Sequence, residues 1–293
     1  MKTYLECIPC FFKQALHAAK LAGASPKIQK KILIKLSKEV PKFSLKSSPP
    51  EMGKTIYSLV NKYSPKKDPY ANEKKKSNEL SLAIYPKLKK IVKSSNKPLL
   101  KAVELAIAGN IIDFGVKANL NIKKELLAIV KRHETEDKPK KDFFQFKAFE
   151  KKLKECKNIL YLGDNAGETV FDRILIEEII SKHKGKKIIY VVKDKPVLND
   201  ALYEDAKVSG LCDLAEIVSS GSDAPGTVLK FCSKDFLKIY RSADMVISKG
   251  QGNYEALSDA KKEIFFLFIA KCPVICKDEA FSLMDMVLKH HYK

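Results

Sequence analysis

Apolar and polar positions alternate in two different ways along this chain. Up to about residue 155, apolar residues recur every three or four positions, which is the period of an amphipathic helix. From residue 158 on, short runs of β-branched and aromatic residues appear between further helical segments. The pattern therefore predicts a helical first part followed by a second part in which strands and helices alternate.

Prolines and capping residues bound the helices predicted in the first part. Ser25-Pro26 supplies an N-cap followed by proline at the first helical position, and Pro49-Pro50 interrupts the helical period. The segment 133–142 has no apolar residue and predicts a connector. The helices expected here cover 11–21, 28–40, 51–60, 70–94, a segment starting near residue 98, 122–131 and 144–154.

The second part predicts an α/β fold, a parallel sheet with helices on both faces. The expected strands are 159–162, 187–192, 216–218, 244–248 and 264–269. The expected helices are 168–183, 199–208, 233–242 and 254–260, with a last helix at 278–290 closing the chain. We accordingly expect two domains, a helical domain at 1–154 and an α/β domain at 155–293.

Charge is concentrated in the helical part. Residues 1–150 carry 32 basic and 14 acidic residues, whereas the remainder carries 23 and 21. Only three of the 55 basic residues are arginine, and lysine lacks the planar fork with which arginine reads bases and phosphates. This composition favours a solvated lysine surface, with attraction of anionic ligands or nucleic-acid binding as alternatives.

The compartment expected from the sequence is the cytoplasm. No apolar run approaches the roughly 20 residues that a membrane-spanning helix needs, and the first residues do not resemble a signal peptide. The seven cysteines are an odd number in a chain large enough to build a core, which indicates reduced thiols. Cys7-x-x-Cys10 could form a zinc site with Cys272 and Cys276, but plain helix-face thiols are the favoured interpretation.

Four loops follow the predicted strands and should meet at one edge of the sheet, because parallel strands all end on the same side. Their sequences are GDNAGE (163–168), KDKPVLND (193–200), SSGSDAPG (219–226) and SKGQGN (248–253). The dinucleotide fingerprint G-x-G-x-x-G is absent, and an aspartate stands where a pyrophosphate would need neutral donors.

The chemistry of these loops suggests a divalent metal and a phosphate. Asp164, Asn165 and Asp200 offer two carboxylates and an amide oxygen, which suit Mg²⁺ or Mn²⁺ better than zinc. On the residues alone, Asp200 could instead cap its helix and Asp164 could occupy a turn. Lys249 lies beside two glycines and could clamp a phosphoryl group. Ser219, Ser220 and Gly221 could donate to phosphate or serve only as turn residues.

Several strings in this order resemble the archaeal and bacterial branch of the damage-control phosphatase family. They are CIPCFFKQAL, DPY, AIAGNIIDFG, YLGDNAGE, PVLNDAL, SSGSDAPGT, SKGQGNYEAL and AKCPV, and together they span nearly the whole chain. The resemblance implies a helical domain packed on a Rossmann-like α/β domain. It also implies metal ligands at Asp164, Asn165 and Asp200, and Lys249 holding the phosphate. Asn110 and Asp113 are implied to lie near the cleft.

We therefore expect a metal-dependent phosphatase that hydrolyses phosphomonoesters of small metabolites, sugar phosphates or damaged phosphometabolites, by metal-assisted attack of water. Co²⁺ or Ni²⁺ are further possible metals, and covalent attack by an aspartate stays open although the D-x-D motif that uses it is absent. The alternatives are a carboxyl methyltransferase that uses S-adenosylmethionine and a non-catalytic protein that binds anions or nucleic acid. The five histidines are not grouped near the four loops, which argues against a Ser-His-Asp triad.

Overall fold

The structure is a computed structural model that describes residues 1–66, 68–111 and 142–292. The predicted helix 122–131, most of the connector at 133–142 and Asp113 lie outside these residues. Within the described ranges, no helix is both long enough and apolar enough to cross a membrane.

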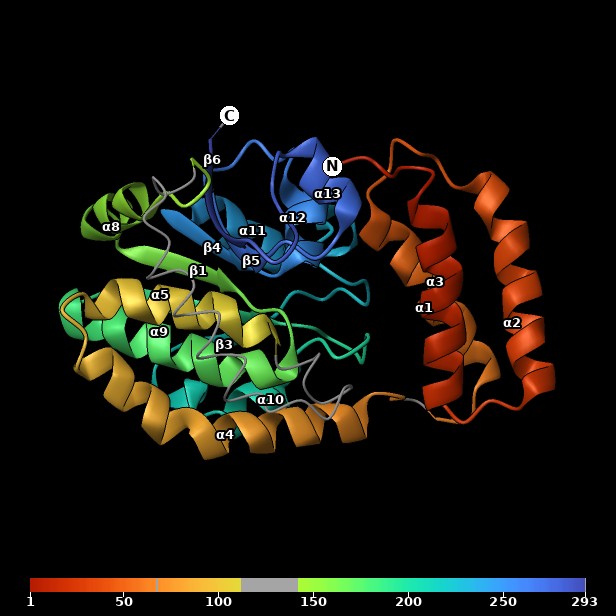
Figure 1. Ribbon diagram of the computed structural model, residues 1–293, viewed down its shortest axis with the longest axis horizontal. Coiled ribbons are helices and arrows are strands. Elements are labelled where there is room, and N and C mark those ends of the chain that lie inside the picture. The colour runs from red at the N-terminus through yellow and green to blue at the C-terminus, as the bar shows by residue number, and fades with distance from the viewer. Residues whose placement is uncertain (67, 112–141, 293) are drawn as a thin grey trace.

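Three helices form a bundle at one end of the molecule (Figure 1): α1 (Cys7–Leu21), α2 (Pro26–Glu39) and α3 (Pro49–Tyr63). The Ser25 hydroxyl accepts the Ile28 N–H at the start of α2, and Ser48 with Glu51 forms a capping box at the start of α3. Each helix buries one apolar face in a shared core, which includes Phe11, Ala15, Ile32, Leu36, Ile56 and Val60.

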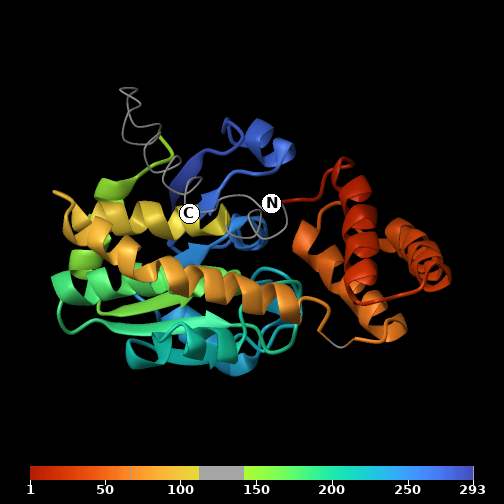
Figure 2. The ribbon, with the colours of Figure 1, turned by 60° about the horizontal axis from the view of Figure 1, so that its bottom comes forward.

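Two further helices follow the bundle in the sequence and lie beside the sheet, α4 (Ala71–Lys93) and α5 (Pro98–Ala108) (Figure 2). Nine of the eleven residues of α5 are buried, because the helix is enclosed between α9 and the sheet. Leu88 of α4 and Leu105 of α5 share one hydrophobic core with the strands. The packing therefore groups α4 and α5 with the α/β part, while the domain boundary at residue 154 stays a prediction.

The sheet has six strands in the order β3-β2-β1-β4-β5-β6. The first five are parallel, as expected, and the sixth pairs antiparallel with β5. The strands are β1 (Asn158–Leu162), β2 (Lys187–Val192), β3 (Glu216–Ser219), β4 (Met245–Lys249), β5 (Ile264–Ile269) and β6 (Met286–His291).

The predicted closing helix at 278–290 is wrong. A short helix, α13 (Pro273–Asp278), ends there and β6 follows. Ala280 and Met284 both adopt positive φ angles, +55° and +69°, which no α-helix accepts. The apolar residues of this segment fit either period, and the fully buried strand β5 needs a partner on its outer edge. The sequence alone does not show that need.

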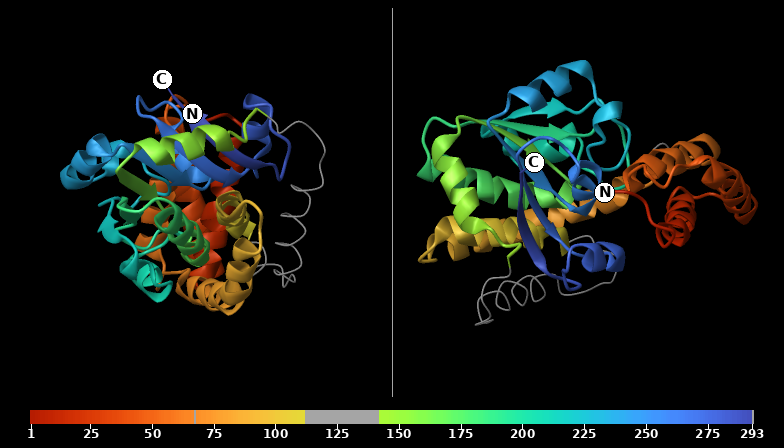
Figure 3. Two further views of the ribbon diagram at one scale, coloured as in Figure 1. Left: turned by 90° about the vertical axis from the view of Figure 1, so that its left-hand side faces the viewer. Right: turned by 90° about the horizontal axis from the view of Figure 1, so that it is seen from above.

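Alternate residues of the central strands enter two separate cores, as the period of a β-strand requires. Tyr161 and Ile247 face α5 and α9 (Thr169–Lys182), whereas Leu160 and Val246 face α11 (Lys234–Ser242) and α12 (Gln251–Leu257). Among the described residues, α8 (Phe146–Glu155) and α10 (Tyr203–Val208) also lie on the first side. Figure 3 shows the sheet between these layers, which confirms the predicted α/β class.

The carboxyl ends of the parallel strands point toward the helical bundle (Figure 1). Lys54 of α3 forms an ion pair with Asp223 in the loop after β3. Val197, in the loop after β2, is 2% exposed and belongs to the core of the bundle. The edge of the sheet at which we expect the site is therefore joined directly to the bundle.

Candidate active site

The loops after β1 and β2 are joined through their backbones, and this brings the three predicted metal ligands together. Ala201 N donates to Asp164 O (2.8 Å), and Ala166 N donates to Asn199 O (2.9 Å). Between these bonds, Asn165 and Asp200 form an isolated antiparallel bridge. Asp200 and Asn165 are buried and Asp164 is half-buried.

The loop after β4 covers Asp164. Asn253 Nδ2 donates to Gly163 O (3.1 Å) and to Lys249 O (2.7 Å), which ties this loop to the end of β1. Gly250 has φ +82° and ψ 154°, a conformation that glycine alone adopts readily. A Cβ at this position would lie 2.7 Å from Asp164 Oδ1 and closer still to Oδ2. The carboxylate therefore occupies the space that the missing side chain leaves.

Beneath these loops lies a fully buried cluster of charges that the sequence did not indicate. Lys249 is 0% exposed, and its Nζ donates to Glu168 Oε2 (3.0 Å) and Asp172 Oδ1 (2.7 Å). The hydroxyls of Tyr161 and Tyr190 donate to the two oxygens of Asp172 (2.7 and 2.8 Å). Glu168 ends the short 3-10 turn η3 (Ala166–Glu168), and Asp172 lies one helical turn further on.

The second oxygen of Glu168 holds two amides. Asn165 Nδ2 donates to Glu168 Oε1 (2.8 Å) and to Asp164 Oδ2 (3.0 Å). Asn110, just after α5 in the turn η2 (Gly109–Ile111), donates from Nδ2 to the same two carboxylates, 3.2 Å from Asp164 Oδ2. Asn110 is thus in contact with a predicted metal ligand, and its expected place near the cleft stays a prediction. A continuous chain of hydrogen bonds runs from Lys249 through Glu168 to Asp164.

The electrostatics of the cluster keep Lys249 charged. Burial disfavours its ammonium form, but the adjacent Asp172 and Glu168 carboxylates outweigh burial and raise the lysine's pKa above its ordinary value. Burial raises the pKa of Asp172, and the Lys249 ammonium opposes that rise. Burial, together with the Asp172 charge, also raises the pKa values of Tyr161 and Tyr190, so both phenols stay protonated donors.

Two more lysines lie around the predicted ligands. Lys193, directly after β2, is buried with its Nζ 3.5 Å from Asp200 Oδ2, and it also donates to Gly226 O. Lys271, after β5, is half-buried and donates to Asn110 O (2.7 Å). Neither residue stands out in the sequence, because both are ordinary members of a lysine-rich chain.

Asp164, Asn165 and Asp200 are chemically suited to a hard divalent cation. They supply two carboxylates and an amide, and the two negative charges match one divalent ion. The amide nitrogen of Asn165 faces Glu168 and Asp164, so its planar geometry directs the Oδ1 oxygen the other way. Among the described residues there is no group of three or more His, Cys, Asp or Glu side chains that could hold a metal. A centre of the zinc type is therefore not seen in this part of the chain.

The other predicted site residues have local roles in the structure. Ser219 Oγ donates to Asp194 Oδ1 (3.2 Å) and accepts the Gly221 N–H (3.0 Å). Ser220 is buried, and its hydroxyl accepts the Ser222 N–H (3.3 Å). These bonds shape the loop after β3, and a contact of this loop with phosphate stays a prediction. Cys7 and Cys10 lie in the first turn of α1, and all seven cysteines are free thiols.

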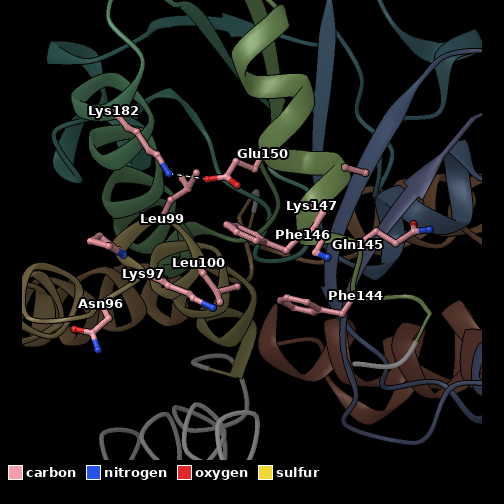
Figure 4. A pocket seen from close by; sticks show the side chains of 12 residues that line it. Asn96, Lys97, Leu99, Leu100, Phe144, Gln145, Phe146, Lys147, Glu150 and Lys182 are labelled. Atoms are coloured by element: carbon pink, nitrogen blue, oxygen red, sulfur yellow. Dashed lines mark hydrogen bonds and ion pairs between the residues drawn. The ribbon is translucent and has the colours of Figure 1, made fainter. Parts of the chain in front are cut away.

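A cavity of about 680 Å³ lies at the opposite end of the sheet. Figure 4 shows its lining, which includes Leu100, Phe144 and Phe146, with an ion pair between Lys182 and Glu150 (2.7 Å) beside it. These residues come from the start of α5, the region of α8 and the end of α9, near the amino ends of the strands. This cavity is therefore separate from the cluster around Asp164.

Comparison with known proteins identifies the family. The sequence pattern of the "Damage-control phosphatase ARMT1-like domain" matches residues 3–287. A "Damage-control phosphatase" from Pyrococcus horikoshii is 32% identical over 95% of this chain and 94% of its own length, and one from Archaeoglobus fulgidus is 34% identical over 76% and 75%. An uncharacterized protein from Methanocaldococcus jannaschii is 37% identical over 97% and 93%.

The fold comparison agrees. The crystal structure of a P. horikoshii protein, described as a DUF89 family protein, superposes with a TM-score of 0.86 at 31% identity and covers 99% of both chains. These matches confirm the resemblance seen in the sequence and the predicted enzyme class, a metal-dependent phosphatase. The chain belongs to the damage-control phosphatase family with the ARMT1-like domain.

Proposed function

We propose that this protein hydrolyses phosphomonoesters of small phosphorylated metabolites, with Asp164, Asn165 and Asp200 holding the divalent cation, Mg²⁺ or Mn²⁺. The observation that carries the assignment is the backbone bridge between Asn165 and Asp200, which supports it because the bridge joins the two strand ends that bear the proposed ligands. When bound there, the cation would withdraw charge from the phosphoryl oxygens.

The chain's own residues support this chemistry in two ways. Lys193 lies beside Asp200, and Lys271 is bonded to Asn110, which contacts Asp164, so both lysines add positive charge near the two carboxylates, which favours approach of an anionic substrate. The glycine at 250 lets the Asp164 carboxylate sit against the backbone of the β4 loop. Together these features would hold a phosphate ester next to the carboxylates while a water molecule accepts the phosphoryl group.

We also infer a cytoplasmic location. All seven cysteines are free thiols, including the exposed Cys10 and Cys212, and a reducing compartment preserves exposed thiols. The oxygen ligands favour Mg²⁺ or Mn²⁺, and Co²⁺ and Ni²⁺ are further candidates.

The test is a phosphatase assay on a panel of sugar phosphates and other phosphomonoesters after treatment with EDTA. Each of Mg²⁺, Mn²⁺, Co²⁺ and Ni²⁺ is then restored alone. We expect activity to vanish with EDTA and to return with Mg²⁺ or Mn²⁺. Asp164→Asn should lower kcat by at least about 100-fold, because a metal ligand loses its charge.

The matched control is Asp194→Asn, which removes an exposed carboxylate from the loop that also carries Asp200. We expect this variant to keep activity within twofold of the unmodified protein. Hydrolysis that persists in EDTA, or that is unaffected by Asp164→Asn, would contradict the assignment.

A further inference from the structure

We infer that Lys249 and Glu168 are positioning residues, which fix the orientation of the metal ligands, and that Lys249 is not the group that holds the phosphate. The inference rests on the proposed function, since it concerns ligands of the same metal. It assigns a defined role to the buried cluster beneath the loops.

The surroundings of Lys249 argue against direct contact with a substrate. The side chain is completely buried, and two of its three N–H donors are directed at carboxylates that lie beneath the loops. Withdrawing the ammonium group toward a phosphate would leave Glu168 and Asp172 as buried carboxylates without their cation. A buried charge that loses its partner is strongly destabilising, so the rearrangement is disfavoured.

Glu168 transmits the position of Lys249 to the ligands. Its Oε2 is held by the lysine, and its Oε1 accepts from the amide groups of Asn165 and Asn110. A planar amide has only two orientations that differ by exchange of nitrogen and oxygen. With Nδ2 held by Glu168, Asn165 directs Oδ1 away from that carboxylate, which leaves this oxygen as the atom that can face a cation. Without Glu168, the amide could turn its positively polarised NH₂ group toward the cation.

The turn that carries Glu168 is itself held tightly. A Cβ on Gly167 would lie 2.8 Å from Cβ of Ser77 in α4, so the turn and this helix are in direct contact. Thr169 Oγ1 donates to Ala166 O (2.6 Å) within the same turn. Glu168 is therefore presented from a rigid element, as a positioning group needs to be.

The experiment measures Mn²⁺ affinity of the full chain by titration calorimetry, without substrate, together with kcat, KM and inhibition by inorganic phosphate. The variants are Glu168→Gln, Lys249→Met and the double variant. Glu168→Gln keeps the shape but can no longer accept from both the lysine and the amides. We expect its Mn²⁺ dissociation constant to rise at least tenfold, because partners of metal ligands typically affect affinity by about 10- to 100-fold.

The double variant separates the two roles of Lys249. The double variant removes the charge of Lys249 and the charge of Glu168. If the lysine acts through Glu168, the neutral glutamine that remains still accepts from the amides through its oxygen. Mn²⁺ affinity of the double variant should then be closer to that of the unmodified protein than either single variant is. Inhibition by phosphate, measured at saturating Mn²⁺, should stay within threefold in all three variants.

Lys101→Met is the matched control, since Lys101 also forms a buried ion pair, with Glu104 (2.7 Å), but within α5 and away from the ligands. It should lower the melting temperature and leave Mn²⁺ affinity unchanged. Glu168→Gln is nearly isosteric and serves alone if Lys249→Met does not fold.

The inference is overturned if Glu168→Gln binds Mn²⁺ within twofold of the unmodified protein. It is also overturned if Lys249→Met weakens phosphate inhibition while Mn²⁺ affinity is unchanged. Failure of the proposed function would look different, because the unmodified protein would then bind Mn²⁺ but hydrolyse no phosphomonoester.

Discussion

Replacing Gly250 by alanine should displace the Asp164 carboxylate without changing any charged residue. The new Cβ would stand 2.7 Å from Oδ1 and closer to Oδ2, so the carboxylate has to rotate away from the β4 loop. The backbone at this position, φ +82° and ψ 154°, is also one that only glycine tolerates well. That conformational strain alone costs about 1–3 kcal/mol.

Two other glycines separate the strain from the contact. Gly185 has a comparable φ of +80°, and a Cβ there would have no atom within 4 Å, so Gly185→Ala measures strain alone. Gly252 lies two residues after Gly250, in the first turn of α12, but its Cβ would be 3.8 Å from the nearest atom of another element, and its φ is not positive. We expect Gly252→Ala to be close to neutral and Gly185→Ala to cost about 1–2 kcal/mol.

The assay combines urea unfolding with titration of Mn²⁺ into the folded protein. Gly250→Ala should lose about 2–4 kcal/mol of stability, from strain plus the displaced carboxylate. It should also bind Mn²⁺ at least tenfold more weakly, whereas both control variants keep the affinity of the unmodified protein. Normal Mn²⁺ binding by Gly250→Ala would refute the reasoning, since Asp164 would then not depend on the space that the glycine leaves.

Three further predictions concern stability. Burial raises the pKa of Glu255 to about 7, so the folded state binds an extra proton between roughly pH 4.5 and 7 and loses stability as the pH rises through that range. Glu255→Gln should remove this loss of stability, which is at most about 3 kcal/mol above pH 7 and smaller because the side chain is half-buried. Identical pH profiles of the variant and the unmodified protein in thermal melts would contradict this prediction. Leu288 of β6 is completely buried, so Leu288→Ala should cost about 2–5 kcal/mol in urea unfolding, and a loss below 1 kcal/mol would argue against β6 as a core strand. The Lys54–Asp223 pair is half-buried and partly screened by solvent, so Asp223→Asn should change stability by less than about 1 kcal/mol, and a larger effect in the same measurement would show that the pair holds the bundle in place.

The sequence predicted those parts of the fold and site that depend on local pattern and on one geometric rule. Parallel strands end on the same side, so Asp164, Asn165 and Asp200 could be expected together before any coordinates were known. The burial of Lys249 could not be predicted, because a lysine at the end of a strand is normally exposed. Glu168 and Asp172 resemble ordinary acids in the first turns of a helix. Only their pairing with a lysine 81 and 77 residues away in sequence distinguishes them.

The strand β6 was missed for a related reason. Its sequence fits a helix as well as a strand, and the choice depends on the open edge of β5, which is a property of the assembled sheet. Asn110 has no neighbouring signal that would select it from an apolar helix, and the family resemblance alone directed attention to it. Contacts between segments far apart in sequence decided each of these cases.

The anchoring of Val197 in the bundle has a mechanical consequence. Two residues separate this valine from Asp200, and the backbone between them is compact, with Leu198 at φ +51° and Asp200 N donating to Val197 O (3.1 Å). A short, hydrogen-bonded segment of this kind stretches little, so a displacement of Val197 is passed on to Asp200. Any tilt of α1–α3 away from the sheet would therefore shift Asp200 relative to Asn165, so that movement of the bundle and the geometry of the proposed metal ligands are coupled.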